Sequence, residues 1–237
     1  MIENIEHGFW HNFEQSIKFK GSISRVDQYK GDENLFIACT QLGTSAKYQQ
    51  EVINAWCNLF NNTKLPIKKI WVTSRISQRI FDAICCQDQL EGLWIKWGVY
   101  PDISNIKKLV NLQFLHLGGG SSITDLSAIL TLKKLISLET ESLYNINDYS
   151  FLSDMKNIID LSIEGDLHAS IKKVKLNSLQ FLEMMPQLLR LNLTMTKIED
   201  HSYRPVTKIS SLKHLTLPDD KDLESDIAGF QNLIIKR

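Results

Sequence analysis

The chain has 237 residues, of which 43% are hydrophobic and 23% charged, a composition that is typical of globular proteins and excludes a wholly disordered chain. Its 27 basic and 27 acidic residues give a formal net charge of zero. A neutral chain has no overall attraction to polyanions, so we expect neither a nucleic-acid nor a membrane-surface partner. No apolar stretch approaches the roughly 20 residues that span a bilayer.

The N-terminal residues and the cysteines favour a cytoplasmic protein. The first residues lack the basic start and apolar run of a secretory signal. Four cysteines are too few for a disulfide scaffold, and the adjacent Cys85 and Cys86 are awkward to bridge. We therefore expect reduced, mostly buried thiols.

Residues 1–66 are expected to form an N-terminal capping region. Residues 17–20 and 22–26 fit a hairpin around Gly21. Residues 35–39 (LFIAC) predict a buried strand, and the apolar spacing of residues 46–60 predicts a helix. A second strand at residues 70–72 and a second helix at residues 78–86, with Ser77 as its cap, continue the strand–helix pattern.

From residue 67 onward the chain repeats. An apolar residue, two free positions, an apolar residue, one free position and a third apolar residue recur, and the starts are 22 to 24 residues apart except for one interval of 30. Thr140 breaks the apolar rule in the fourth repeat. The triplets are Ile67/Ile70/Val72, Leu90/Leu93/Ile95, Leu112/Leu115/Leu117, Leu135/Leu138/Thr140, Ile158/Leu161/Ile163, Leu188/Leu191/Leu193 and Leu212/Leu215/Leu217.

This pattern resembles the leucine-rich-repeat family, whose unit of 20–29 residues begins L-x-x-L-x-L. The resemblance covers residues 67–217, and the segments 102–109 (DISNIKKL) and 123–129 (ITDLSAI) look like the bacterial, internalin-type variant. It implies an α/β solenoid of about seven repeats over residues 67–237, with parallel strands on the concave face. Strand–helix units at the N-terminus and a helical C-terminal cap, with Leu223, Ile227, Phe230 and Ile234 as its apolar face, would close the two ends.

The sequence departs from the family pattern in three places. The position eight residues after each start, usually asparagine or cysteine, carries neither in any repeat, so we expect the following turn to be satisfied differently. Thr140 predicts the weakest layer of the solenoid. The long interval contains an insertion near residues 170–176, which we expect to bulge from the return side.

Alternate side chains of each strand should line the concave face. The aromatic residues on this face fall in the first repeats, and the acidic residues fall in the middle ones. The predicted partner-binding residues are Trp71, Trp94, Lys96, Trp97, Phe114, His116, Glu139, Glu141, Asp160 and Glu164. An aromatic patch beside an acidic patch suits protein recognition. Two alternatives stay open: the N-terminal segment covers the tryptophans, or the glutamates are simply a solvated face.

Catalytic and metal-binding patterns are weak. His7 and His11 would share a helix face, but no third ligand is evident, so we favour a surface or packing role. The glycines at 118–120 lack the lysine and spacing of a phosphate loop and predict a tight turn. We therefore expect no enzyme activity, no cofactor and no metal.

The favoured hypothesis is a cytoplasmic protein-binding module that uses its concave face. A sharper version is an immunity protein that neutralises a cognate toxin, because the acidic patch suits a basic toxin domain. The alternatives are a small enzyme or a nucleic-acid-binding protein with the solenoid as scaffold. The latter would need a continuous basic strip, whereas Lys69, Lys96 and Arg190 are well separated.

Overall fold

The computed structural model describes residues 5–16, 21–166, 171–218, 220 and 234–236. Within these residues, nine strands form one parallel sheet in the order β1-β2-β3-β4-β5-β6-β8-β10-β11. The strands are β1 (Asn34–Ile37), β2 (Lys69–Ser77), β3 (Gly92–Val99), β4 (Phe114–Leu117), β5 (Ser137–Glu141), β6 (Asp160–Glu164), β8 (Arg190–Asn192), β10 (His214–Thr216) and β11 (Ile234–Lys236).

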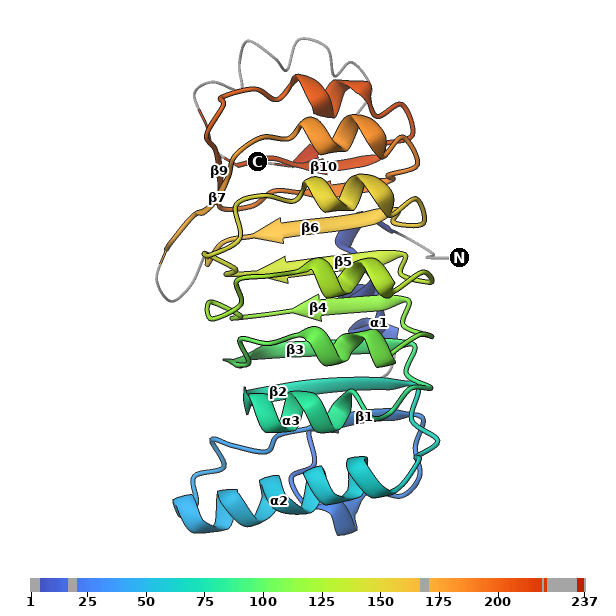
Figure 1. Ribbon diagram of the computed structural model, residues 1–237, viewed down its shortest axis with the longest axis vertical. Coiled ribbons are helices and arrows are strands. Elements are labelled where there is room, and N and C mark those ends of the chain that lie inside the picture. The colour runs from blue at the N-terminus through green and yellow to red at the C-terminus, as the bar shows by residue number, and fades with distance from the viewer. Residues whose placement is uncertain (1–4, 17–20, 167–170, 219, 221–233, 237) are drawn as a thin grey trace.

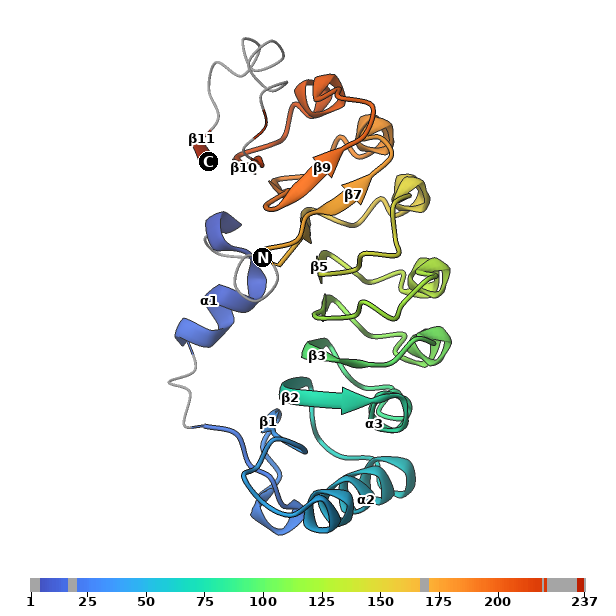
Figure 2. The same ribbon diagram turned by 90° about the vertical axis from the view of Figure 1, so that its left-hand side faces the viewer.

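Helices lie on both sides of this sheet, as Figures 1 and 2 show. The α-helices are α1 (Phe9–Ser16), α2 (Ala46–Asn62) and α3 (Gln78–Ile84). The 3-10 helices are η1 (Ile5–His7), η2 (Val26–Gln28), η3 (Ser104–Lys108), η4 (Ser127–Thr131), η5 (Ser150–Asp154), η6 (Gln180–Met184) and η7 (Arg204–Lys208). In Figure 2 the sheet forms the concave side of a curved stack and η3 to η7 follow one another along the convex side.

The strand register confirms the repeat predicted from sequence. Leu93 of β3 pairs with Leu115 of β4, Leu115 pairs with Leu138 of β5, and Leu138 pairs with Leu161 of β6. Leu161 then pairs with Leu191 of β8. These side chains are fully buried in one continuous core, because a single unit cannot bury its own apolar face and must stack on its neighbours.

The N-terminal strand–helix units join the same sheet and core. Strand β1 pairs with β2, so the sheet continues across residue 67. Ser45 caps α2 by accepting a hydrogen bond from the amide of Tyr48, and α2 buries Trp56. The buried Gln87 donates to the carbonyls of Phe60 and Thr63, which ties the end of α2 to the next unit.

Several predicted details at the two ends are wrong. Residues 17–20 of the predicted hairpin lie outside the described residues, but Ile23 makes a parallel bridge with Ile37 instead of an antiparallel turn. Ser77 precedes α3 without a side-chain cap bond. The predicted closing helix falls mostly outside the described residues; Ile234, assigned to it, lies in β11 and pairs with His214.

The internalin-like segments form a recurring turn before the convex 3-10 helices. The carboxylate of Asp102 accepts from the amide of Ser104 at 2.8 Å, and that of Asp125 accepts from the amide of Ser127 at 2.7 Å. These hydrogen bonds hold the pKa of both carboxyl groups below the ordinary value, because they stabilise the charged form. In both segments the aspartate thus satisfies an amide at the start of the 3-10 helix.

A different ladder stands in for the missing asparagine ladder. The residue immediately before five of the repeat starts donates a side-chain hydrogen bond to a backbone carbonyl of an earlier repeat unit; before the last start, Ser211 donates to Leu188. Gln89 donates to Leu65, Asn111 to Asp88, Asn157 to Lys133 and Gln187 to Ile158. These bonds satisfy carbonyls that the repeat leaves without a strand partner.

Two buried tyrosines make hydrogen bonds near the ends of the strands. The hydroxyl of Tyr100 donates to the carbonyl of Gly118 at 2.8 Å, and the hydroxyl of Tyr149 lies 3.2 Å from that of Thr140. Thr140 also donates to the carbonyl of Ser162. The layer that the sequence marks as weak therefore contains a hydroxyl pair inside the core, while burial raises the pKa of both tyrosines.

The insertion in the long interval does not bulge from the convex return. Residues Val174–Leu176 form strand β7, which pairs in parallel with β9 (Thr196–Ile198) of the next repeat. Asp166 and Lys172 form an antiparallel bridge just before it. Figures 1 and 2 place this small second sheet at the edge of the solenoid where the main strands end.

Candidate functional site

The concave face is partly covered by the chain's own N-terminal helix. Figure 2 shows α1 on the concave side of the sheet, well away in sequence from the strands beside it. Its sequence, FWHNFEQS, places Phe9, Trp10 and Phe13 on one face, whereas His11 and Glu14 are exposed. The helix is therefore amphipathic, and its aromatic face is turned to the sheet.

An aromatic ladder crosses the first four strands beneath this helix. Phe36 stacks on Trp71 with ring centroids 5.9 Å apart, Trp71 lies 4.5 Å from Trp94, and Trp94 stacks on His116 at 4.9 Å. Nδ1 of His116 lies 3.2 Å from Oε2 of Glu139 on the next strand. The strand register places one of these side chains on each of β1 to β5, so the sheet itself builds the ladder.

The three aromatic residues of α1 pack onto Trp71 of this ladder and onto Phe114 of β4. Phe9 stacks on Phe114 with centroids 3.4 Å apart, Trp10 meets Trp71 edge-on at 5.4 Å, and Phe13 stacks on Trp71 at 6.1 Å. Trp10 is 2% exposed and Trp71 is 8% exposed. The edge-on contact between Trp10 and Trp71 is a favourable arrangement for an aromatic pair.

A buried ion pair lies under the N-terminal end of α1. Nη1 of Arg190 donates to Oδ1 of Asp160 at 2.7 Å, and Ser137 donates to Oδ2 of Asp160 at 2.8 Å. The amide of Phe9 donates to the same Oδ2 at 3.3 Å. Asp160 is 0% exposed, and its carboxylate is held by groups from two neighbouring strands and a helix N-terminus, where a negative charge is favourable.

Gly8 allows the chain to approach this ion pair closely. Its φ of +81° lies in the left-handed region, and a Cβ there would lie 2.7 Å from Oε1 of Glu139 and 2.9 Å from Nη1 of Arg190. Burial lowers the pKa of the Arg190 guanidinium, but the charges of Asp160 and Glu139 outweigh that effect and leave the pKa raised. Arg190 therefore stays charged beneath the helix.

The accessible acidic groups lie at the ends of β5 and β6. Glu141 and Glu164 are paired in register and half-buried, and Oε2 of Glu141 lies 3.8 Å from Nε2 of His116. Oε1 of Glu164 accepts a hydrogen bond from the hydroxyl of Ser162. A partner on the concave side would therefore meet a carboxylate pair beside the covered ladder.

Lys96 and Trp97 lie apart from the ladder. The ring of Trp97 lies under the guanidinium of Arg75 at 5.4 Å, where β2 and β3 extend past a bulge. Lys96 is exposed, and Val99 on the same strand is 47% exposed. These residues form a separate patch at the edge where the strands end.

The structure therefore divides the predicted site residues and corrects part of the prediction. Trp71, Trp94, His116 and Glu139 lie in one line, but Trp71, His116, Glu139 and Asp160 are buried, so the aromatic and acidic residues do not form one exposed patch. The N-terminal segment covers the ladder, which was one of the two alternatives. Glu141, Glu164, Lys96, Trp97 and Phe114 keep partial or full exposure.

Sequence reasoning missed Arg190 and the face of α1. Arg190 and Asp160 occupy the same column of neighbouring repeats, so the repeat alignment contained the signal for this pair. The aromatic spacing at residues 9–13 was the signal for α1. Arg190 is engaged in the ion pair with Asp160. Lys69, Lys96 and Arg190 of the described chain therefore form no continuous basic strip on the concave face.

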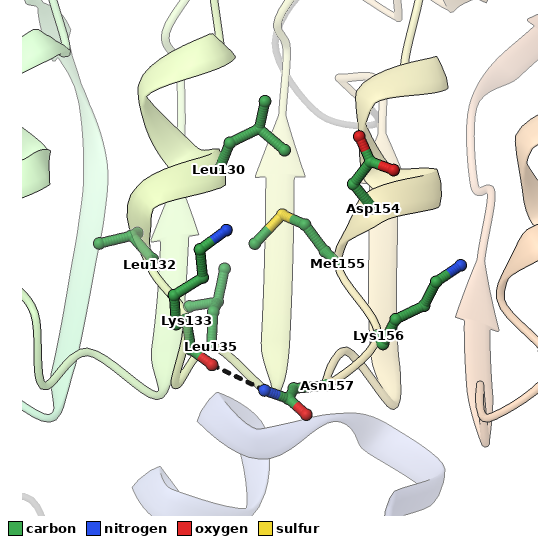
Figure 3. A pocket seen from close by; sticks show the side chains of 8 residues that line it. All are labelled: Leu130, Leu132, Lys133, Leu135, Asp154, Met155, Lys156 and Asn157. Atoms are coloured by element: carbon green, nitrogen blue, oxygen red, sulfur yellow. Dashed lines mark hydrogen bonds between the residues drawn. The ribbon is translucent and has the colours of Figure 1, made fainter.

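The hollow between η4 and η5 and the His7–His11 pair have the features of side-chain packing and not those of a catalytic or metal-binding site. Figure 3 shows a hollow between η4 and η5, where Leu130 and Met155 face each other and Asn157 donates to the carbonyl of Lys133. His7 and His11 lie with ring centroids 4.8 Å apart, but no group of three potential metal ligands occurs in the described chain. Nor does any helix in the described part combine the length and apolarity needed to cross a bilayer.

Comparison with solved structures identifies the fold. The crystal structure of the internalin InlF from Listeria monocytogenes matches with a TM-score of 0.61 and 21% sequence identity, over 86% of this chain and 53% of the internalin. This chain has the leucine-rich-repeat fold. A leucine-rich-repeat protein of Leptospira interrogans, LIC12759, matches with a TM-score of 0.51 and 15% identity, over 92% of this chain and 58% of that protein.

These matches confirm the internalin-like leucine-rich-repeat fold predicted from the repeat. The chain spans little more than half the length of either protein. No protein-family model and no curated protein matches the sequence.

Proposed function

We propose that this leucine-rich-repeat chain binds a partner protein through its concave side and carries out no reaction there. One observation carries the proposal: the concave face already holds a polypeptide segment, α1, through aromatic stacking and a hydrogen bond to a buried carboxylate. The chemistry of this face therefore suits protein more than a small substrate. Aromatic side chains supply such contacts at low cost in conformational entropy.

The accessible acidic groups give the surface a preference for a basic partner. Glu141 and Glu164 lie in register on neighbouring strands, and both are partly exposed. Carboxylates at the edge of an interface raise the rate of association with a basic surface and orient it. Lys96 and Trp97 lie at the same ends of the strands and would extend the contact.

A sharper form of the proposal is an immunity protein that neutralises a basic toxin domain in the cytoplasm. The acidic pair supports the basic partner. The thiols of Cys39, Cys57, Cys85 and Cys86 are all free, and three of them are buried, which suits a reducing compartment.

The test is capture of a partner, followed by charge reversal. We expect a partner protein identified by affinity capture to bind the purified full chain, and Glu141→Lys/Glu164→Lys to weaken that binding by about tenfold or more, or roughly 1.4 kcal/mol. Asp154→Lys/Glu183→Lys, which reverses two exposed charges on the convex side, is the matched control.

Two results would contradict the proposal. Equal weakening by the concave and convex variants would remove the concave side as the binding surface. For the immunity role, co-production of the chain with a captured basic nuclease should restore growth of the host cells. Failure to do so, while the two proteins bind, would leave a binding module without that role.

A further inference from the structure

The concave face contains a socket shaped for a tryptophan. Gly92 of β3 lies between Lys69 and Phe114 in the strand register. A Cβ at Gly92 would lie 2.9 Å from Cη2 of Trp10, so the indole occupies the space that any other residue would fill. The ladder ring of Trp71 meets the indole edge-on and forms one side, and the side chain of Lys69 also lies beside Gly92.

Beside the socket, the carboxylate of Asp160 binds the N-terminus of the helix; we call this carboxylate the anchor. Arg190 and Ser137, both in strands of the solenoid, orient the carboxylate of Asp160. Its remaining interaction is with the amide of Phe9, the first residue of α1. Amides at a helix N-terminus have no partner within the helix, so a fixed carboxylate at this place selects a helix in one direction.

Helix α1 depends on its contacts with the concave face for its stability. Helix α1 has eight residues, and a helix of that length is not stable by itself in water. Its polar face, with His11, Glu14 and Gln15, is exposed. The helix therefore forms only when it is docked, and undocking exposes the ladder.

The fit of α1 is also incomplete. Nε1 of Trp10 is buried and has no hydrogen-bond acceptor among the described residues. A buried N–H without an acceptor costs free energy, so a partner helix that brings an acceptor for the tryptophan Nε1 into the socket would fit better.

We propose that the socket and its carboxylate anchor form a binding site for an amphipathic helix of a partner protein, and that α1 is a replaceable occupant of this site. The partner helix presents aromatic residues at positions i, i+1 and i+4, as Phe9, Trp10 and Phe13 do, and offers its first amide to Asp160. This inference rests on the proposed protein-binding function, and it names the segment that the partner would insert.

The test uses a fluorescent peptide with the sequence of residues 5–16 and the full-length chain. Phe9→Ala/Phe13→Ala in the full chain weakens its own α1 and leaves the groove intact. We expect the peptide to bind this variant roughly tenfold or more tightly than the wild type, because a larger fraction of the chain has an open groove. A peptide carrying the same two substitutions is the matched control and should not bind.

A groove variant completes the set. Adding Gly92→Ala to the full-length Phe9→Ala/Phe13→Ala chain fills the socket and should abolish the gain in peptide affinity. Equal affinity of the peptide for the wild type and for Phe9→Ala/Phe13→Ala would overturn the proposal. So would binding that Gly92→Ala leaves unchanged.

Hydrogen exchange of the wild type keeps the proposal testable if the substituted chain fails to fold. The amides of residues 9–16 should exchange much faster than those of β4 and β5, since α1 undocks without unfolding the solenoid. If the amides of α1 exchange as slowly as those of β4 and β5, so that they exchange only on global unfolding, the proposal is overturned. Because no partner takes part in these measurements, their failure removes the helix site alone, whereas failure of partner capture removes the protein-binding function.

Discussion

Arg190 and Asp160 face each other on the neighbouring strands β8 and β6, and the distance between Nη1 and Oδ1 is 2.7 Å. The carboxylate is fully buried, and the guanidinium side chain is only 9% exposed. The pair lies on the concave side, beneath the N-terminal end of α1. Its two members come from repeats on either side of the insertion, so it joins the two parts of the solenoid at the point where α1 docks.

Arg190→Met tests this pair. The variant leaves the Asp160 carboxylate buried without its cation, and we expect a loss of about 3–5 kcal/mol in the free energy of unfolding. Asp160→Asn/Arg190→Met removes both charges and should cost less than Arg190→Met alone. Urea unfolding followed by circular dichroism measures both. A larger loss in the double variant would show that the charges do not stabilise each other.

Gly8→Ala tests the close approach of α1 to the ion pair. An added methyl group at Gly8 meets Glu139 and Arg190, whereas one at Gly21, which also has a positive φ, meets nothing within 4 Å. Both variants carry the backbone cost of about 1–2 kcal/mol for a left-handed alanine. Only Gly8→Ala should undock α1, measured as faster hydrogen exchange at Phe9 and a weaker near-ultraviolet circular dichroism signal. Identical behaviour of the two alanine variants would rule out the steric explanation.

The hydroxyl pair of Thr140 and Tyr149 predicts a non-additive pair of substitutions. Tyr149→Phe removes one hydroxyl and should cost about 1 kcal/mol, because Thr140 keeps a buried hydroxyl with one partner fewer. Thr140→Val/Tyr149→Phe restores an aliphatic residue at the repeat position and should be closer to the wild type than the sum of the single variants. A thermodynamic cycle from thermal unfolding measures the coupling, and strict additivity would contradict it.

The polar ladder before the strands predicts a cost for removing one rung. Nδ2 of Asn157 donates to the carbonyl of Lys133 at 2.7 Å. Asn157→Leu leaves that carbonyl without its partner and should lower the free energy of unfolding by about 1–2 kcal/mol. Asn147→Leu, at an exposed asparagine in the turn before η5, is the control and should change stability by less than about 0.5 kcal/mol.

The buried thiols predict an alkaline limit to stability. Burial raises the pKa of Cys39 from 9.0 to about 12, and the neighbouring Cys57 adds to the effect. A raised pKa means that the folded chain keeps a proton that the unfolded chain loses. The stabilisation is therefore complete below pH 9.0 and is lost as the pH rises toward about 12. The urea midpoint should fall over this range, and less steeply in Cys39→Ala.

Thiol labelling gives an independent check of the same burial. At pH 8 a thiol reagent should modify the exposed Cys86 in the native chain, whereas Cys39 and Cys85 should react only after unfolding. Rapid native labelling of all four thiols would contradict the packing of α2 and α3 against the sheet.

The repeat made most of the solenoid predictable. Evenly spaced aliphatic triplets identified the strands and their mutual register, since side chains alternate along a strand and each unit must bury the same face. The same alignment placed Trp71, Trp94, His116 and Glu139 in one column. The place of the insertion was wrong, and Ile234 of the predicted closing helix lies in a strand, because irregular segments have no period that fixes their place.

The burial of the candidate site was not predictable in the same way. Whether Trp71 is a contact residue or a packing residue depends on a segment about 60 residues earlier, and the repeat carries no information about that contact. Likewise, Asp160 counts as an acidic surface group in the sequence and as a buried partner of Arg190 in the structure. Charge and polarity are properties of residues, but exposure is a property of what covers them.

By itself, then, the sequence determined the strands, their order and which side chains share the concave side, because a local period is enough to specify each of these. Only the tertiary structure decided that α1 lies on that side and that the ion pair is buried beneath it. Contacts between segments far apart in the chain depend on the complementary shape and chemistry of both surfaces, and neither surface is complete until the repeats have stacked.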